Sequence, residues 1–283
     1  MNDAKKVAVI NLKGGVGKST TTLALSTMLA GAFHKKILVI DLDPQTNSTI
    51  MLIGENKWQM LNNQGRTLHT FFKAALDGTS PVDINSIVQR DVSNIRDVSG
   101  IDLLPSSLDM VDLQDRIGMA GQRQFNWCNP TDILMSAIGG IEGAYDYIII
   151  DCPPNLGLIT LNGLKIADGF VIPTIPDYLS TYGIPQIVTR VKKFSESIDR
   201  NIQCYGVIPT RVRAQSRQHI MTIDRLRKGY DAPCFNSILY ESTRISEAAE
   251  YLAYNTLHQK WGYMRQYEQL HALASEFMWR VDS

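Results

Sequence analysis

The chain has 283 residues, of which 44% are hydrophobic and 20% are charged, a composition that predicts an ordinary folded core and is feasible for one large α/β sheet. No apolar run approaches the roughly 20 residues of a membrane span, and the few residues before the first predicted strand leave no room for a signal peptide. The net charge is zero, and the four cysteines and five histidines are scattered without a Cys-x-x-Cys pair, which argues against a zinc or iron–sulfur site and for reduced thiols in a cytoplasm.

The first predicted element is a strand that runs into a glycine-rich loop. Apolar residues 7–10 precede three glycines between positions 14 and 17, and residues 20–29 read as a helix. This order predicts a nucleotide-binding loop, although Leu12 stands where the strict pattern has glycine. A glycine-rich hairpin or linker is the alternative. The loop residues expected to bind the nucleotide are Lys13, Gly14, Gly15, Val16, Gly17, Lys18, Ser19 and Thr20.

Each part of this loop has a chemical reason. Glycines let the main chain approach a phosphate closely, and the N–H groups of the loop and of the helix start point at the anion. We expect Lys18 to reach the β- and γ-phosphates and Ser19 to place its hydroxyl on Mg²⁺. Lys13 is a second lysine beside the glycines, where the pattern does not require one.

Two carboxylates follow the second predicted strand, residues 36–41. Because Pro44 argues that the strand stops there, one carboxylate can face the γ-phosphate and hold the attacking water. We assign this role to Asp43, which is nearer the loop, and expect Asp41 to support Mg²⁺ through its water shell. The alternative is a pair of carboxylates that cap a turn.

Residues 54–100 are less regular and predict an excursion from the main sheet. Asn62–Gly65 and Asp77–Pro81 read as turns around a short helix over residues 67–76. A strand over residues 101–105 follows.

The strongest apolar run, residues 147–151, ends in Asp151. An acid at the end of such a strand is expected to support Mg²⁺ through a water. Pro153 and Pro154 stiffen the loop that follows. Since all three predicted motifs lie at strand ends, one nucleotide could touch them all.

Strands and helices alternate in the remaining sequence. We expect strands over residues 169–174, 204–209 and 235–239, and helices over residues 156–167, 184–198, 215–228, 246–254 and 263–279. Such alternation predicts a single doubly wound, mostly parallel sheet with helices on both faces, comprising residues 1–283 as one domain.

Positive charge is concentrated between residues 190 and 228. This stretch has ten basic residues and three acidic ones, which suggests a basic face in a neutral protein. A solvated helix face is the alternative reading. The candidates for DNA contact within it are Arg190, Lys192, Lys193, Arg211, Arg213, Arg217, Arg225, Arg227 and Lys228.

These motifs together resemble the ParA/MinD group of P-loop ATPases. Residues 13–20 are similar to its deviant Walker A loop, residues 41–45 to its second motif and residues 150–154 to its Walker B motif. The resemblance implies a P-loop NTPase fold, ATP and Mg²⁺ as ligands, and a homodimer that encloses two nucleotides. Lys13 resembles the lysine that crosses the dimer interface to the partner's phosphates. Family position places adenine near Pro209, Thr210 and the 239–242 loop, and it places Arg244 near both the nucleotide and the DNA face.

Within the group, the basic stretch favours a DNA partition ATPase. Such a protein binds nonspecific double-stranded DNA as an ATP dimer, and a centromere-binding or cargo adaptor stimulates its slow hydrolysis, in the cytoplasm on the nucleoid. The C-terminal helix has few basic residues, which predicts a packing helix and no membrane contact. Only six residues precede the first strand, so we expect no N-terminal helix-turn-helix domain.

Two other functions fit the same motifs. One is a cargo- or septum-positioning ATPase scaffold that does not use DNA. The other is a P-loop kinase for a small molecule, with arginines 211–227 as its lid. Charge-reversed arginine pairs distinguish the scaffold from the DNA-binding protein, and product analysis identifies a kinase.

Overall fold

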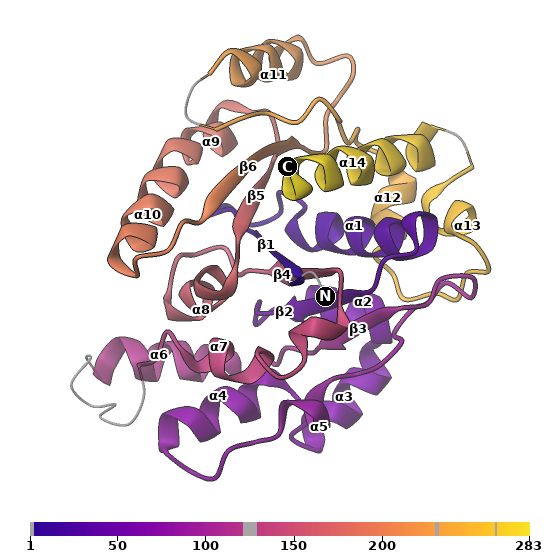
Figure 1. The fold of residues 1–283 in the computed structure, drawn as a ribbon. Coiled ribbons are helices and arrows are strands. Elements are labelled where there is room, and N and C mark those ends of the chain that lie inside the picture. Colours follow the sequence, from indigo (N-terminus) through magenta and orange to yellow (C-terminus); the bar gives the residue numbers. More distant parts are fainter. Residues whose placement is uncertain (1–2, 121–128, 230–231, 264) are drawn as a thin grey trace.

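The computed structural model describes residues 3–120, 129–229, 232–263 and 265–283, and its centre is a six-stranded parallel sheet (Figure 1). The strand order is β3-β2-β4-β1-β5-β6. The chain therefore builds one half of the sheet, returns to the middle and builds the other half, so the prediction of a doubly wound sheet is confirmed. The strands are β1 (Lys5–Val9), β2 (Ile37–Asp41), β3 (Ile101–Leu104), β4 (Tyr147–Asp151), β5 (Gly169–Thr174) and β6 (Gln203–Pro209).

Helices connect the strands and cover both faces of the sheet (Figure 1). Those before β4 are α1 (Lys18–Phe33), α2 (Asn47–Ile53), α3 (Glu55–Asn63), α4 (Leu68–Asp77), α5 (Ile84–Ile87), α6 (Met110–Ala120), α7 (Ile133–Ile138) and the 3-10 helix η2 (Glu142–Ala144). Those after β4 are α8 (Leu158–Ile166), α9 (Tyr178–Tyr182), α10 (Ile184–Ser197), α11 (Arg217–Lys228), α12 (Thr243–Glu247), α13 (Leu257–Trp261) and α14 (Arg265–Asp282).

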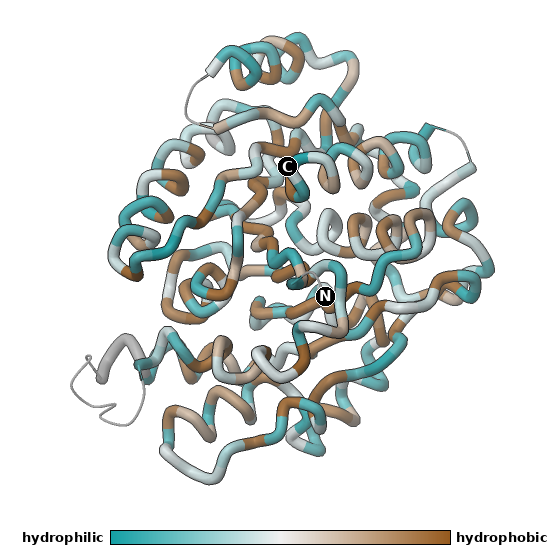
Figure 2. Tube along the Cα trace, viewed as in Figure 1, coloured by the Kyte–Doolittle hydropathy of each residue, from teal (hydrophilic) through white to brown (hydrophobic). Residues whose placement is uncertain are grey.

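The sheet divides the buried apolar side chains into two cores. Alternate residues of a strand point to opposite faces, so Val7 and Val9 of β1 enter the core that contains α1 and α14. Ala8 lies in the other core, with helices α4 to α8. Both faces of the central strands are buried, which explains their unbroken apolar sequence (Figure 2).

The 54–100 segment contains more helix than the sequence predicted. Helices α3 and α5 were not expected, whereas α4 matches the predicted helix within one residue at each end. Trp58 on α3 is largely buried and donates from Nε1 to the carbonyl oxygen of Ser106, 3.1 Å away. This contact ties the segment to the loop after β3.

The predicted strand at residues 235–239 is wrong. Phe235 and Leu239 donate backbone hydrogen bonds to β6, at 2.8 and 2.9 Å, but no continuous ladder forms. Pro209 has no N–H with which to extend the pairing. The N–H groups of Asn236 and Ser237 donate instead to the Glu276 carboxylate, at 2.9 and 2.8 Å.

The predicted helix at residues 246–254 is also wrong. Helix α12 begins earlier and ends at Glu247, and Tyr254 forms an isolated parallel bridge with Ile95. The N–H of Tyr254 donates to the carbonyl oxygen of Asn94 at 2.8 Å. Pairing with the 54–100 segment thus replaces the helical bonds that the sequence pattern suggested.

The C-terminal helix α14 packs against the sheet core, as predicted. Leu270, Leu273 and Phe277 are fully buried beside α1, whereas Trp279, which the sequence placed in the same apolar set, is 69% exposed. In the described ranges, no helix has the length and apolar content to cross a membrane. Cys128 lies outside the described residues, and the other three cysteines are free thiols.

Lys260 is a fully buried amine in the α1 core, and it predicts a pH-dependent stability. Its Nζ donates to Asn94 Oδ1 at 2.6 Å, and burial lowers the pKa of Lys260 to about 7. Between pH 7 and about 10.4 the unfolded chain therefore binds more protons, so folding stability rises with pH in that window. Relative to Lys260→Met, the wild type should gain up to about 1.4 kcal/mol per pH unit there.

Urea unfolding of both proteins at several pH values measures this difference. Lys57→Met removes an exposed lysine and serves as the control. A stability difference between wild type and Lys260→Met that stays constant from pH 7 to 10 would contradict the interpretation.

Candidate functional site

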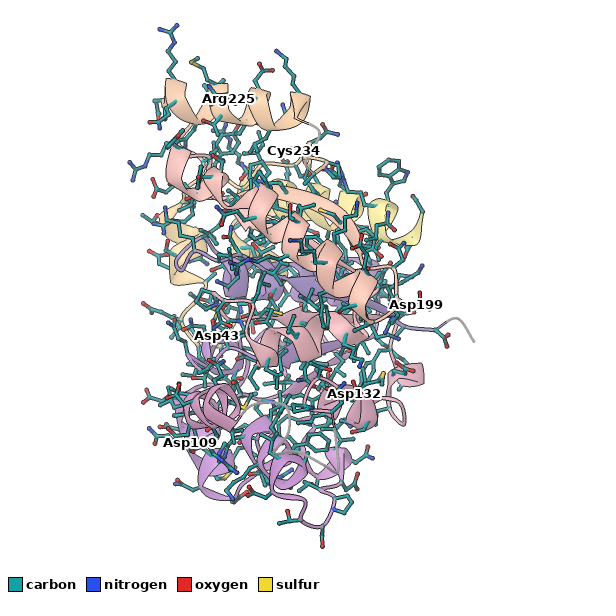
Figure 3. The ribbon with its side chains drawn as sticks, turned by 90° about the vertical axis from the view of Figure 1, so that its left-hand side faces the viewer. Asp43, Asp109, Asp132, Asp199, Arg225 and Cys234 are labelled. Carbon is teal, nitrogen blue, oxygen red and sulfur yellow. The ribbon has the colours of Figure 1, made fainter. Side chains whose placement is uncertain are left out.

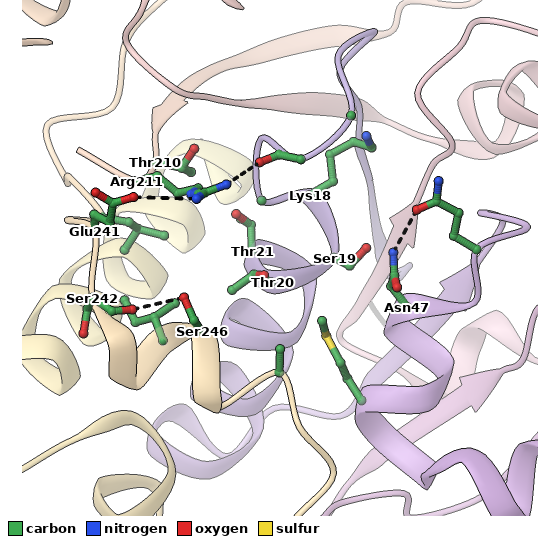
Figure 4. Close-up of a pocket in the computed structure, with 18 of the residues that line it drawn as sticks. Lys18, Ser19, Thr20, Thr21, Asn47, Thr210, Arg211, Glu241, Ser242 and Ser246 are labelled. Atoms are coloured by element: carbon green, nitrogen blue, oxygen red, sulfur yellow. Dashed lines mark hydrogen bonds and ion pairs between the residues drawn. The ribbon is translucent and has the colours of Figure 1, made fainter. Parts of the chain in front are cut away.

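A cavity of about 390 Å³ opens at the carboxyl end of the sheet, above the start of α1 (Figure 4). It is the place where the loops after β1, β2 and β4 meet, because β1 lies at the point where the strand order reverses. Its lining residues are Gly14, Gly15, Gly17 to Thr21, Asp43, Gln45, Asn47, Met51, Pro154, Thr210, Arg211, Leu239 to Ser242, Ile245, Ser246 and Ala249.

The glycine loop has the conformation that its sequence predicts. Gly15 and Gly17 have φ values of 73° and 90°, which L side chains rarely adopt, and Gly17 leads directly into α1. Asn11 holds the beginning of the loop: its Nδ2 donates to the carbonyl oxygen of Pro173 at 2.8 Å, and its Oδ1 accepts from the N–H of Lys13 at 2.9 Å. The loop is thereby fixed to β5.

Lys18 lies at the bottom of the cavity and is only 6% exposed. Its Nζ donates to the carbonyl oxygen of Lys13 at 3.4 Å. Burial lowers the pKa of Lys18, and the charges of Asp151 and Asp43 act in the opposite direction. A partly desolvated ammonium group of this kind would bind a polyphosphate strongly.

Asp43 faces the same cavity from the loop after β2 (Figure 3 labels its position). Its Oδ1 accepts from the N–H of Gln45 at 3.0 Å. Burial raises the pKa of Asp43, while that hydrogen bond and the charge of Lys18 lower it. A carboxylate held in this way can accept a hydrogen bond from a water in the cavity.

Asp151 ends β4 directly beside the glycine loop. Its Oδ2 accepts from Ser48 Oγ at 2.6 Å, but its Oδ1 is buried without a hydrogen-bond partner. Burial raises the pKa of Asp151 to about 6, which the hydrogen bond from the Ser48 hydroxyl partly offsets. The unsatisfied oxygen and the Ser19 hydroxyl fit a hard divalent cation and its water. In the described ranges, no three His, Cys, Asp or Glu side chains come together as a metal cage.

Asp41, which the sequence predicted to support Mg²⁺ through its water shell, takes part in a network of buried hydrogen bonds. Like Asp151, it is fully buried and does not itself line the cavity. Its Oδ2 accepts from the N–H and Oγ1 of Thr49, at 2.8 and 2.7 Å, and its Oδ1 accepts from the N–H of Asp43 at 3.1 Å. Burial and the adjacent charge of Asp151 raise the pKa of Asp41 well above its usual range. The carboxyl group therefore shapes the Asp43 loop.

Lys13 does not line the cavity of its own chain. Its Nζ donates to Ser180 Oγ at 2.8 Å and lies 3.4 Å from Asp177 Oδ2, at the start of α9. The side chain is 42% exposed. The Lys13 ammonium group is thus available to another molecule, although Lys13 belongs to the glycine loop, which is also called the phosphate loop below.

Three further predicted residues fall on the opposite wall of the cavity or behind it. Thr210 lines the cavity and donates from Oγ1 to the carbonyl oxygen of Val16 at 2.7 Å. Val16 and Pro209 are buried and do not line it. Val16 and Pro209 therefore support the backbone segments from which the lining residues project.

The basic residues separate into two groups. Those on α10 and α11 are exposed: Arg190, Lys192, Lys193, Arg217, Arg225, Arg227 and Lys228. Arg211 instead lines the cavity, Arg213 pairs with Glu241 at 2.7 Å, and Arg244 lies 3.6 Å from Glu247 on α12. Arg211 and Arg213 are also exposed, at 54% and 66%, but both are paired with Glu241.

The chain is similar in sequence to a family of known ATPases. A model of the AAA_31 family, described as an AAA domain, matches residues 4–204, more than two-thirds of the chain. The sporulation initiation inhibitor protein Soj of Bacillus subtilis is 28% identical over 244 residues, which cover 86% of this chain and 87% of Soj. The chain belongs to the ParA/Soj-type AAA_31 family of deviant Walker A ATPases.

Solved structures share the fold of this ParA/Soj-type ATPase. A plasmid partition protein of Borrelia burgdorferi, solved with AMPPNP, has a TM-score of 0.73 at 21% identity and covers 98% of this chain and 99% of its own. Cyanothece McdA has a TM-score of 0.76 at 24% identity and covers 97% of this chain and 99% of its own. Both confirm the P-loop α/β architecture.

Some residues at the site of this ParA/Soj-type ATPase were not predicted. Glu241 and Asn47 line the cavity, and Asp177 and Ser180 hold Lys13. Glu241 was expected only as part of the 239–242 loop, and no role was assigned to it. Asp177 had a local signal of its own, because an Asp shortly after a strand is a plausible helix start. Asp177 indeed accepts from the N–H of Ser180 at 2.6 Å.

Proposed function

We propose that this chain is an ATP-dependent partition switch. Binding of ATP and Mg²⁺ closes a homodimer, the dimer binds nonspecific double-stranded DNA, and an adaptor protein tied to a cargo stimulates slow hydrolysis, in the cytoplasm on the nucleoid. The observation that carries the proposal is the cavity itself. Lys18 and Asp43 face it, whereas a second lysine of the same loop, Lys13, is directed away from it.

The proposal gives each group at the cavity a role. Lys18 neutralises the β- and γ-phosphates, and the N–H groups of the glycine loop surround them. Asp43 orients the attacking water. Ser19 and the unsatisfied oxygen of Asp151 would hold Mg²⁺ and its water; when bound, Mg²⁺ supplies charge neutralisation at the phosphates. Adenine would lie near Thr210 and the 239–242 loop, where Leu239, Ile245 and Ala249 offer apolar contact.

Lys13 explains why closure would need two copies. Its side chain is accessible, and its present partners lie at the start of α9 and not in the nucleotide cavity. In a face-to-face dimer this ammonium group would enter the partner subunit's cavity and stabilise the charge that develops on the phosphates.

The exposed basic residues of α10 and α11 form the proposed DNA surface. Arg225 lies at the outer end of the molecule on α11, far from Asp109 (Figure 3). Dimerisation doubles this positive surface, and contacts to DNA phosphates release counterions, so binding should weaken steeply with salt and show no sequence preference. Contacts to DNA phosphates do not require side chains that reach the edges of the bases.

The double variant Arg217→Glu, Arg225→Glu tests this surface. We expect its affinity for arbitrary duplex DNA, with ATP present, to fall about tenfold or more, and the slope of affinity against salt to decrease by about one for each lost contact. ATP hydrolysis without DNA should be unchanged. Fluorescence anisotropy at several salt concentrations measures both quantities.

The double variant Lys57→Glu, Arg96→Glu makes the same charge change outside α10 and α11 and should bind DNA like the wild type. If the ATP-bound wild type shows no salt-dependent affinity for DNA, the DNA-binding function is wrong. The positioning scaffold that does not use DNA would then be the better description.

A further inference from the structure

Arg211 faces the nucleotide cavity although it belongs to the basic sequence stretch. Its Nη1 donates to the carbonyl oxygen of Gly15 in the phosphate loop at 3.1 Å (Figure 4). Its Nη2 lies 3.6 Å from Glu241 Oε1 across the mouth of the cavity. Arg211 therefore bridges the phosphate loop and the 239–242 loop, and its guanidinium is near the place where phosphates would bind.

The backbone around Arg211 fixes this orientation. The N–H of Val212 donates to the carbonyl oxygen of Leu239 at 3.0 Å, and the N–H of Glu241 donates to that of Val212 at 2.9 Å. Arg211 itself has a φ of 49°, a left-handed conformation that is uncommon for arginine. A strained backbone held by its neighbours is typical of a site at which a side chain must point in one direction.

Glu241 is an unusual group to find in a cavity for a polyanion, because its charge repels phosphate. Two guanidinium groups compensate it: Arg213 donates from Nε to Oε2 at 2.7 Å, and Arg211 lies on the other oxygen. The hydrogen bond from Arg213 is the main reason why the pKa of Glu241 is lowered. The cluster of Arg211, Glu241 and Arg213 keeps one net positive charge.

Within this cluster the two arginines are not equivalent. Arg213 is 66% exposed, lies outside the nucleotide cavity and has no contact with the phosphate loop. Arg211 is 54% exposed, but it has one such contact and lines the cavity. Glu241 thus connects an arginine at the surface to an arginine at the nucleotide site.

We propose that Arg211 binds the phosphates of the nucleoside triphosphate in its own subunit, and that Glu241, anchored by Arg213, is a positioning residue that keeps the Arg211 guanidinium over the phosphate loop. This inference rests on the proposed ATP site and deepens it. It also removes Arg211 from the set of DNA contacts. A planar guanidinium that donates several hydrogen bonds is suited to phosphate oxygens, and a charge-assisted bond of this kind contributes strongly when water is partly excluded.

Arg211→Ala is expected to weaken binding of a fluorescent ATP analogue about tenfold. DNA affinity at saturating ATP should stay within about twofold of the wild type, because the α10 and α11 surface is intact. Arg211→Lys, which keeps the charge and loses the planar fork, should bind ATP with intermediate affinity. Arg96→Ala, which removes an exposed arginine elsewhere, should leave ATP affinity unchanged.

Glu241→Gln separates positioning from simple electrostatics. Removal of a negative charge from the cavity would by itself strengthen ATP binding, whereas a misplaced Arg211 weakens it. We expect binding about threefold weaker or more in the wild-type background. In an Arg211→Ala background only the electrostatic effect remains, so Glu241→Gln should no longer weaken ATP binding there and should instead strengthen it, since coupled residues are not additive. Tighter ATP binding by Glu241→Gln would overturn the positioning role.

The outcomes for the inference and for the proposed function are distinguishable. A wild type that binds and hydrolyses ATP, together with an Arg211→Ala variant of equal ATP affinity, refutes the inference alone. An Arg211→Ala variant that loses DNA affinity and keeps ATP affinity returns Arg211 to the DNA surface and also refutes it. A wild type that does not bind ATP refutes the proposed function. If Arg211→Ala does not fold, as judged by circular dichroism, equal ATP affinity of Arg211→Lys and wild type is the refuting result.

Discussion

Asp43→Asn is expected to reduce ATP hydrolysis by about 10²- to 10⁴-fold while ATP binding persists. The asparagine has the same shape and can still accept from the N–H of Gln45, so the loop should keep its conformation. The amide, however, cannot attract and orient the attacking water as a carboxylate does. Phosphate release and equilibrium binding of a fluorescent ATP analogue measure the two effects separately, and the variant should accumulate as an ATP-bound dimer.

Asp199→Asn is the matched control, because Asp199 is exposed and its left-handed backbone tolerates asparagine. It should hydrolyse ATP like the wild type. If the Asp43→Asn variant hydrolyses ATP at the wild-type rate, another group orients the attacking water. Asp151 would be the next candidate, because its Oδ1 has no hydrogen-bond partner and lies beside the glycine loop.

The sequence predicted the sheet well because buried parallel strands are continuous apolar runs. Strands β4 and β5 have the predicted bounds, and β2, β3 and β6 differ from theirs by one residue at one end. Right-handed crossovers between parallel strands place their carboxyl ends along one edge of the sheet. The 235–239 segment has a similar apolar pattern, but what decides its structure is the carboxylate of Glu276, which takes two of its N–H groups. Competition from a residue about 40 positions away is not visible in a local pattern.

Nucleotide-loop residues could also be predicted, because their spacing along the chain is itself the signal. Lys18 and Asp43 line one cavity, as the motifs indicated. The sequence distinguished Asp43 from Asp41 only by its position nearer the loop. The choice between them depends on Thr49, whose N–H and hydroxyl turn the Asp41 carboxylate away from the cavity.

Long-range partners account for the remaining differences at the site. Arg211 contacts Gly15, which is 196 residues earlier, and Lys13 contacts Ser180, which is 167 residues later. A charge count over a stretch of sequence treats all arginines alike. Only the fold shows that Arg211 belongs to the cavity whereas Arg217 and Arg225 remain on the exposed surface.

Lys13→Ala is expected to abolish ATP-dependent dimerisation and to reduce hydrolysis by about 10²-fold or more, while a monomer still binds ATP through Lys18. The ion pair of Lys13 with Asp177 is partly exposed and contributes at most about 1 kcal/mol, so a triphosphate on the partner subunit can displace it. Light scattering with a nonhydrolysable ATP analogue measures dimerisation. Lys18→Ala should differ by losing nucleotide binding itself.

Mixing the Lys13→Ala and Asp43→Asn proteins tests whether this lysine acts across the interface. In a mixed dimer, the subunit that lacks Lys13 keeps its own Asp43 and receives a lysine from its partner, so one complete site is restored. Hydrolysis should therefore appear in the mixture although neither variant has it alone. If Lys13 acts only within its own chain, both sites of the mixed dimer are defective and no activity returns. Asp177→Asn, which keeps the α9 cap and weakens the ion pair, should dimerise at least as readily as the wild type.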